Sequence, residues 1–127
     1  MSERGPVRSF FRIAKTYPPG DGEYLTTQDR RGPPSAGLCS EQREVWDAYS
    51  AFDSLEAAIE KVRDLGGLRG WLVVRYDIPP GAAIRWKKTF GPGHYSLWGD
   101  KEELKRCLTD IVVQVQRPAP PGSGGTR

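Results

Sequence analysis

The sequence predicts an α+β domain built on a mixed, mainly antiparallel sheet with two short helices. Segments rich in branched and aromatic residues follow one another along the chain, some directly and some separated by a helical pattern. Two stretches show a capping-box pattern followed by an apolar stripe at helical spacing. Because strands that follow one another both directly and across helices do not suit a doubly wound parallel sheet, we expect the mainly antiparallel arrangement.

The first predicted element is a strand over residues 9–16. Aromatic and branched side chains alternate in part along it, and a Pro-Pro-Gly sequence follows. Arg12 lies within this strand. Residues 20–40 contain Gly, Pro, Asp, Arg and Ser with few apolar anchors, so they predict a long loop around a short segment at 23–25.

The middle of the chain predicts a second strand and the first helix. Ser40 is the expected N-cap of a helical turn over residues 40–46. Residues 46–52 look extended, because their aromatics alternate with small or polar residues. Asp53 and Glu56 have the spacing of a capping box, an apolar stripe follows, and two consecutive glycines end the predicted helix.

The C-terminal half predicts three more elements. Residues 71–78 form a largely apolar strand, and residues 83–89 are expected to return antiparallel to it as a hairpin. A polar loop carrying His94 follows. Asp100 is then the expected N-cap of the second helix, and residues 110–116 supply the last strand.

The length of 127 residues corresponds to one domain. We expect a single globular α+β domain over residues 9–116. Residues 1–8 are polar and are expected to be flexible, and the Pro/Gly-rich tail over residues 117–127 is expected to be disordered, because neither end buries enough apolar surface to offset its ordering entropy.

Charge and cysteine content limit the classes of function. A net charge of +3 permits an anionic partner without demanding one, and one short basic and aromatic run at residues 85–88 leaves nucleic acid disfavoured. Two cysteines and one histidine show no zinc spacing, so we expect no metal site and reduced thiols. Since no signal peptide or membrane-spanning run is present, we expect a cytoplasmic protein without membrane contact.

The segment from Gly91 to Asp100 is the strongest candidate for a functional site. It places the one histidine of the chain, His94, between two glycine-bearing turns and near Trp98. Imidazole titrates near neutrality, and glycine allows a backbone path closed to other residues. We expect His94 to act as an acid, a base or a hydrogen-bond donor in a pocket that Trp98 helps to shape. The alternative is a structural histidine bonded to loop carbonyls.

Arg12, Tyr49 and Ser50 complete the predicted pocket. An arginine within an apolar strand either faces solvent or directs its guanidinium toward an anion. The Tyr49-Ser50 step before a helix suits a ribose or a nicotinamide-like ring, although serine at that place is also ordinary capping chemistry. The prediction assigns cofactor binding to Arg12, Tyr49 and Trp98, and catalysis to Ser50 and His94.

Four stretches of the chain carry a resemblance to known sequences: Phe11-Arg12-Ile13-Ala14-Lys15-Thr16-Tyr17-Pro18-Pro19, Asp47-Ala48-Tyr49-Ser50-Ala51-Phe52, Ile78-Pro79 and Gly93-His94-Tyr95-Ser96-Leu97-Trp98-Gly99-Asp100. Through them, residues 9–116 resemble a family of small uncharacterised bacterial proteins. The resemblance is specific as a family match and nearly silent about activity.

More distantly, an arginine on the first strand, a Tyr-Ser step before a helix and a later polar loop are similar in order to the three motifs of ADP-ribosyltransferase-like domains. The likeness implies an ADP-ribosyltransferase-like fold with NAD as cofactor. It also implies that Arg12 binds an NAD phosphate or ribose and that Ser50 supports the nicotinamide pocket. The third motif departs from the family, which usually places there a glutamate that stabilises an oxocarbenium-like transition state. No glutamate precedes Asp100 in this region, and His94 would substitute in part.

The sequence therefore predicts a nucleotide-like anion pocket in an NAD-dependent, toxin-like ADP-ribosyltransferase. Its partners would be the nucleotide-like small molecule and a protein target or antitoxin, and a housekeeping role stays open. The alternative is a non-enzymatic protein-interaction module that uses exposed Trp86 and Trp98 together with the flexible ends. The enzymatic hypothesis requires Arg12, Ser50 and His94 to meet around one cavity.

Overall fold

The computed structural model describes residues 7–89, 91 and 93–117. The strands in this part of the chain are β1 (Arg8–Ala14), β2 (Tyr49–Phe52), β3 (Leu72–Ile78), β4 (Ile84–Lys88), β5 (His94–Gly99) and β6 (Leu108–Gln114). The helices are the 3₁₀ turn η1 (Asp21–Tyr24), α1 (Thr27–Arg31), α2 (Ser40–Glu44), α3 (Leu55–Asp64) and α4 (Lys101–Arg106). The predicted α+β class is confirmed. Residues 1–6 and 118–127 of the two expected flexible ends lie outside the described residues, and Arg8 already belongs to β1.

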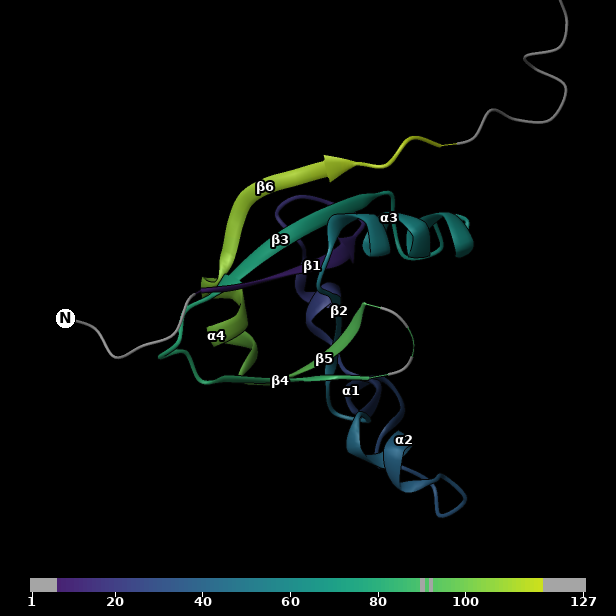
Figure 1. Ribbon diagram of the computed structural model, residues 1–127. Helices are drawn as coiled ribbons and strands as arrows, with labels where there is room; N and C mark the ends of the chain where they lie inside the picture. Colours follow the sequence, from purple (N-terminus) through teal and green to yellow (C-terminus); the bar gives the residue numbers. More distant parts are fainter. Residues whose placement is uncertain (1–6, 90, 92, 118–127) are drawn as a thin grey trace, which may run out of the picture.

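The six strands form one sheet in the order β4-β5-β2-β1-β3-β6. Figure 1 shows β1 and β2 in the middle, with β3 and β6 on one side and β5 and β4 on the other. Every pairing among the described strands is antiparallel. The mainly antiparallel sheet is thus confirmed, and the parallel component implied by a mixed sheet is wrong for this part of the chain.

The predicted hairpin between residues 71–78 and 83–89 is wrong. β3 pairs with β1 and β6, whereas β4 pairs with β5 from Ile84↔Gly99 to Lys88↔Tyr95. The physical reason lies in burial, because β3 buries residues on both faces and therefore occupies the interior of the sheet, while the mostly exposed β4 forms an edge. The expected loop around His94 is also wrong, since residues 94–99 form β5.

The described residues contain four α-helices: the two that the sequence predicts, α2 (Ser40–Glu44) within the helical turn expected over residues 40–46, and α1 in the segment expected as a loop. The expected helices are α3 and α4, and Asp100 caps α4 as predicted by accepting two backbone N–H groups of the first turn. In α3 the cap is Ser54 rather than Asp53, because the Ser54 hydroxyl accepts the N–H of Ala57.

The segment expected as a long loop contains η1 and α1, and α2 follows it. A capping box fixes α1: Thr26 Oγ1 accepts the N–H of Asp29, and the Asp29 carboxylate accepts the N–H of Thr26. Cys39, not Ser40, precedes the first residue of α2 as its N-cap. The strand expected over residues 46–52 is shorter, because turn residues occupy its first part and β2 begins at Tyr49.

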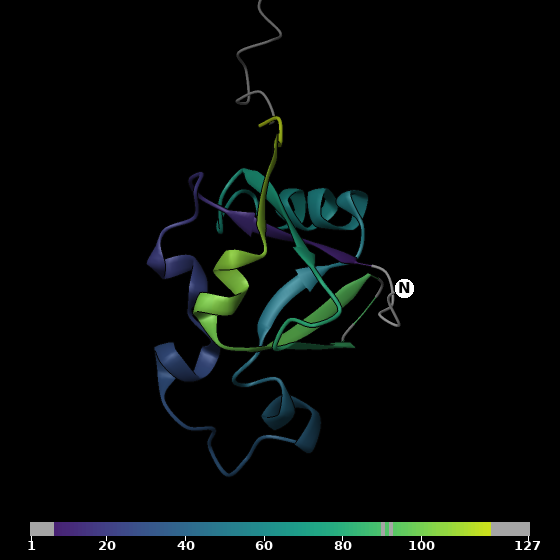
Figure 2. The same ribbon diagram turned by 90° about the vertical axis from the view of Figure 1, so that its left-hand side faces the viewer.

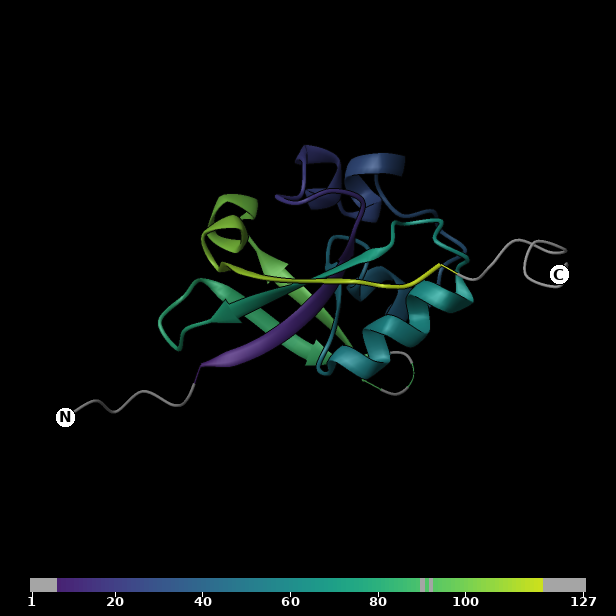
Figure 3. The same cartoon turned by 90° about the horizontal axis from the view of Figure 1, so that it is seen from above.

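The sheet buries apolar side chains on both faces. One cluster lies on the side of η1 and α4 and includes Phe10, Tyr24, Tyr76, Leu97 and Leu104. The other lies beneath α3 and includes Phe52, Ala58, Val62, Val73 and Val115. Figure 3 shows α3 and α4 on opposite sides of the strands, and Figure 2 shows η1 and α1 along one side of the molecule.

β1 and β2 diverge after a single residue pair. Phe11↔Phe52 is their one register pair, whereas β1 and β3 pair over seven residues. Arg12 lies where the strands separate, and its Nε donates to the backbone oxygen of Ser50 at 2.9 Å. A side chain thus takes the place of a main-chain ladder bond, and it connects the two strands beyond the point where they part.

The connection between α3 and β3 makes a close approach at Gly70. Its φ is +119°, and an added Cβ would lie 2.1 Å from the backbone oxygen of Ala14. We expect Gly70→Ala to lower the free energy of unfolding by more than about 2 kcal/mol, because the backbone must shift to relieve both strain and overlap.

Gly37→Ala is the matched control, since no atom lies within 4 Å of the Cβ it would add. Its stability should stay within about 1 kcal/mol of the parent. Urea unfolding followed by tryptophan fluorescence measures both variants, and equal stabilities would contradict the close packing at Gly70.

Candidate functional site

A cavity of about 360 Å³ lies where β1 and β2 diverge. Its walls come from β1, β2 and β5, from the C-terminal half of α3, and from the helical segments η1 and α1. Arg12, Ser50 and His94 all line it. Three predicted site residues from remote parts of the chain therefore share one cavity, which is the arrangement that the enzymatic hypothesis requires.

Arg12 is buried, with 9% of its surface exposed, so the solvent-facing alternative is wrong. Besides its bond to Ser50, the guanidinium lies among three tyrosine rings. The guanidinium carbon is 5.4 Å from the ring centre of Tyr49 and 5.9 Å from those of Tyr24 and Tyr76. Aromatic faces attract cations, so the rings stabilise the charge inside the fold.

The tyrosines do not neutralise Arg12. Burial raises the pKa of both Tyr49 and Tyr76, so these phenols stay protonated at neutral pH. The Tyr76 hydroxyl is also 2.8 Å from the hydroxyl of Tyr24. Among the described residues no carboxylate forms an ion pair with Arg12. A buried cation that lacks a counter-ion is costly, and an anion bound in the cavity would remove that cost.

Tyr49 and Trp98, the other two predicted cofactor-binding residues, do not line this cavity. Tyr49 belongs to the core cluster and reaches the site only through Arg12. Trp98 is 7% exposed, donates its ring N–H to the backbone oxygen of Glu44, and lies beneath the guanidinium of Arg85.

The expected exposure of the two tryptophans in the interaction-module alternative holds only in part. Trp98 is buried, and Trp86 is partly buried and packs against the core cluster. The alternative itself stays a prediction.

The tautomer of His94 follows from its hydrogen bonds. Nδ1 is 3.1 Å from the backbone oxygen of Thr89, which can only accept, so Nδ1 carries the hydrogen. Nε2 is 2.5 Å from Ser50 Oγ and therefore accepts the hydroxyl hydrogen. The imidazole edge also contacts the ring of Phe52, with ring centres 5.3 Å apart. Ser50 and His94 thus form a hydroxyl–imidazole pair oriented by a carbonyl.

Burial lowers the pKa of His94, and the nearby ammonium groups of Lys61 and Lys88 lower it further, although the bond to Thr89 acts in the opposite direction. The imidazole is therefore neutral at pH 7. A neutral ring can accept a proton at Nε2. It offers little stabilisation to a positive charge, which is the role of the glutamate in the family that the sequence resembles.

The β4–β5 turn sets the position of His94. Gly91 and Gly93 both have positive φ, and the N–H of Asp53 donates to the oxygen of Gly93. Thr89 contributes its hydroxyl as well as its carbonyl, because its Oγ1 lies 3.0 Å from His94 Nδ1 and 2.8 Å from the hydroxyl of Ser96.

Several residues that line the cavity have no local sequence signal. Glu23, Arg30, Lys61 and Arg69 reach it from η1, α1, α3 and the α3–β3 connection, and each has the pattern of an ordinary surface charge. Ser96 could be placed beside the site only if residues 94–99 were recognised as a strand, because alternation then puts it on the face of His94.

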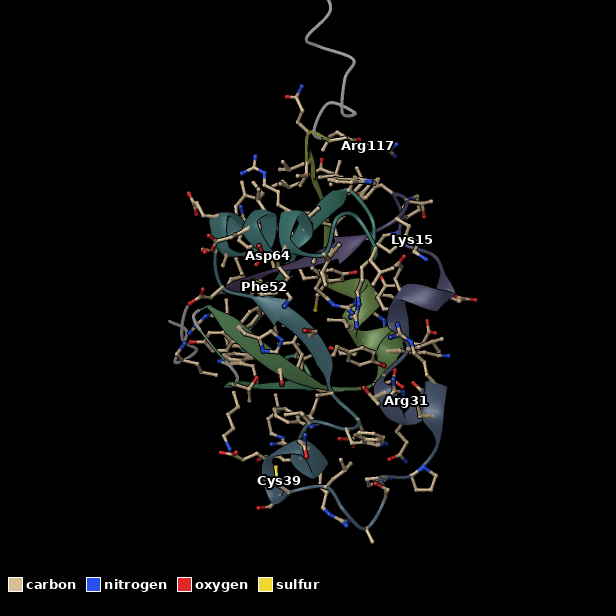
Figure 4. All side chains as sticks on the ribbon, turned by 90° about the vertical axis from the view of Figure 1, so that its right-hand side faces the viewer. Lys15, Arg31, Cys39, Phe52, Asp64 and Arg117 are labelled. Carbon is tan, nitrogen blue, oxygen red and sulfur yellow. The ribbon has the colours of Figure 1, made fainter. Side chains whose placement is uncertain are left out.

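Figure 4 shows the surroundings of the cavity. Phe52 lies at the end of β2 below α3, while Lys15 and Arg31 lie on the other side of this view, next to the segment of η1 and α1. Within residues 7–89, 91 and 93–117, no three His, Cys, Asp or Glu residues gather closely enough to hold a metal ion. No helix in the same part of the chain has the length and apolar character needed to cross a membrane.

No protein-family model, curated protein or solved structure matches the chain. The resemblance to ADP-ribosyltransferase-like domains therefore stays a prediction.

The lowered pKa of His94 predicts a pH dependence of stability. The unfolded chain protonates the ring near pH 6.5, whereas the folded protein does so only at lower pH. The unfolded state therefore binds more protons between these values, so the free energy of unfolding is fully kept above pH 6.5 and falls as the pH decreases below it. His94→Gln should lack this part of the dependence.

Urea unfolding of parent and His94→Gln at about pH 7.5 and about pH 5.5 measures the difference. His94 is the one histidine in the sequence, so its NMR ring signal gives the midpoint directly. A midpoint at or above 6.5 would contradict a ring that burial keeps neutral.

Proposed function

We propose that the cavity binds a nucleotide-like anion and that the protein acts in the cytoplasm as an NAD-dependent ADP-ribosyltransferase on a protein target. The observation that supports the proposal is the buried guanidinium of Arg12, which lacks a carboxylate partner among the described residues and lines the same cavity as the Ser50–His94 pair.

The charges around the cavity favour an anion. Four cations line it, and Glu23 is the one carboxylate among its described lining residues. The cations are Arg12, Arg30, Lys61 and Arg69. A cavity whose walls carry excess positive charge concentrates anionic ligands, and its volume falls in the range of about 300–1,000 Å³ typical of small-molecule sites.

The arrangement suits NAD in one orientation. The ring of Phe52 offers an apolar wall for the nicotinamide beside Ser50 and His94. Arg12 would then contact a phosphate or ribose of the same molecule, as the family resemblance implies. Guanidinium groups hold phosphates through charge-assisted hydrogen bonds.

The transfer step uses the neutral imidazole as a base. The bond between the ribose C1′ and the nicotinamide nitrogen breaks, and its electron pair leaves with nicotinamide. A hydroxyl of the target forms the new bond to C1′. Its proton passes to Ser50 Oγ while the Ser50 hydroxyl hydrogen passes to His94 Nε2, the accepting atom of the inferred tautomer. We expect slow transfer, because the cationic cavity stabilises a developing oxocarbenium ion less well than a glutamate would.

NAD⁺ binding tests the proposal. NAD⁺ should raise the melting temperature of the parent, and the shift should be absent in Arg12→Met, which keeps the alkyl stem but removes the charge. Thermal unfolding with increasing NAD⁺ measures the shift.

Arg85→Met is the control, because this arginine covers Trp98 away from the cavity and should leave the shift unchanged. If Arg12→Met does not fold, calorimetric titration of the folded Arg12→Lys variant with NAD⁺ serves as the test. Unchanged affinity in that variant, or no shift in the parent at saturating NAD⁺, would remove the support for the proposal.

The catalytic role of His94 is tested by nicotinamide release. His94→Ala should reduce the rate constant by about 100-fold, the usual scale for a general base, while the dissociation constant for NAD⁺ stays within about threefold. Tyr95→Phe is the control, since Tyr95 neighbours His94 in β5 but packs against Phe10 in the other core cluster. An equal rate in the parent and His94→Ala would exclude the imidazole as the base.

A further inference from the structure

A second cavity of about 410 Å³ adjoins the first. The two cavities share Glu23, Arg30 and Arg69 in their walls. Ser50 and His94 line only the first, whereas Lys15 lines the second and not the first. If a ligand binds at the Ser50–His94 pair and extends past Arg30, its other end therefore lies in the second cavity.

The second cavity carries an excess of positive charge. Lys15, Arg30 and Arg69 line it, against the one carboxylate of Glu23. None of these three cations forms an ion pair with a described residue, whereas Lys87 and Lys105 elsewhere on the surface do. One oxygen of Glu23 already accepts the backbone N–H of Lys15 at 3.2 Å, so the carboxylate is directed to the main chain.

The backbone holds the three cations in place. The close approach of Gly70 to Ala14, where an added Cβ would also lie 2.8 Å from the Cα of Lys15, keeps Arg69 next to Lys15 in space. The capping box at the start of α1 fixes the helix that carries Arg30, and it uses the carboxylate of Asp29 for the cap. Main-chain packing and the helix cap therefore fix the backbone positions from which these three exposed cations extend.

We propose that the nucleotide bound in the first cavity carries a phosphomonoester at its far end, and that Lys15, Arg30 and Arg69 bind this group in the second cavity. The inference rests on the proposed nucleotide binding and specifies the ligand further. A phosphomonoester offers close to two negative charges and three acceptor oxygens, which suits three cations that line one cavity. Among dinucleotides that contain nicotinamide, NADP⁺ has such a group on its adenosine ribose and NAD⁺ does not.

The experiment compares the affinities of the full chain for NAD⁺ and NADP⁺ by calorimetric titration at low ionic strength. The parent should bind NADP⁺ about tenfold more tightly than NAD⁺. Lys15→Ala should reduce this preference to about twofold and leave the NAD⁺ affinity within about twofold, because Lys15 lines only the second of the two cavities.

Lys101→Ala is the matched control, since it removes an exposed lysine of α4 that lines neither cavity, and it should keep the full preference. Equal affinity of the parent for NAD⁺ and NADP⁺ would overturn the second subsite while leaving nucleotide binding intact. The subsite would also be overturned if Lys15→Ala weakened both ligands alike, or if Lys101→Ala lost the preference to the same degree. Failure of both dinucleotides to bind would overturn the proposed function and the inference with it.

Discussion

The hydrogen bond from Arg12 Nε to the backbone oxygen of Ser50 is the interaction on which the site depends. β1 and β2 share one register pair and then separate, so main-chain pairing alone does not hold them together at this level of the sheet. The guanidinium spans the separation and satisfies a carbonyl that a ladder would otherwise satisfy. The β2–β5 ladder, which pairs Ser50 with Ser96 and Phe52 with His94, places the Ser50 hydroxyl at bonding distance from the imidazole. The Arg12 bond and the divergence of β1 from β2 thus shape the cavity, and the β2–β5 ladder brings the hydroxyl–imidazole pair to its wall.

The electrostatic character of the site has the same origin. Tyrosine rings surround Arg12 and stabilise its charge without cancelling it, because burial keeps the phenols of Tyr49 and Tyr76 neutral. The uncancelled charge acts on the cavity together with that of Lys61, which also helps to keep the imidazole of His94 unprotonated. An anion-attracting cavity and a neutral ring that can take up a proton therefore arise together in this fold.

Local patterns were sufficient for the elements whose signals are local. The apolar stripes of α3 and α4, the Asp100 cap of α4 and the apolar runs of β1 and β3 needed no knowledge of the rest of the chain. The partner of β4 could not be obtained this way, because adjacency in sequence favoured β3 while burial assigned β3 to the sheet interior. At the site, local sequence was enough to single out Arg12 within an apolar strand, Ser50 in a Tyr-Ser step before a helix, and His94 between glycine-bearing turns. Arg30 and Arg69 did not, because only the folded chain brings these two surface charges to one cavity.

The close packing of Gly93 against α3 restricts how the chain can vary. An added Cβ at Gly93 would lie 2.9 Å from that of Ala57, and the oxygen of Gly93 receives the N–H of Asp53, so the hairpin is joined to the first turn of the helix. A one-residue slip of β5 against β2 would turn the imidazole to the opposite face of the sheet. We therefore expect an added residue to be tolerated better in the largely exposed stretch between α1 and α2 than within β5, where pairing with β2 as well as its own bonds holds His94 in place.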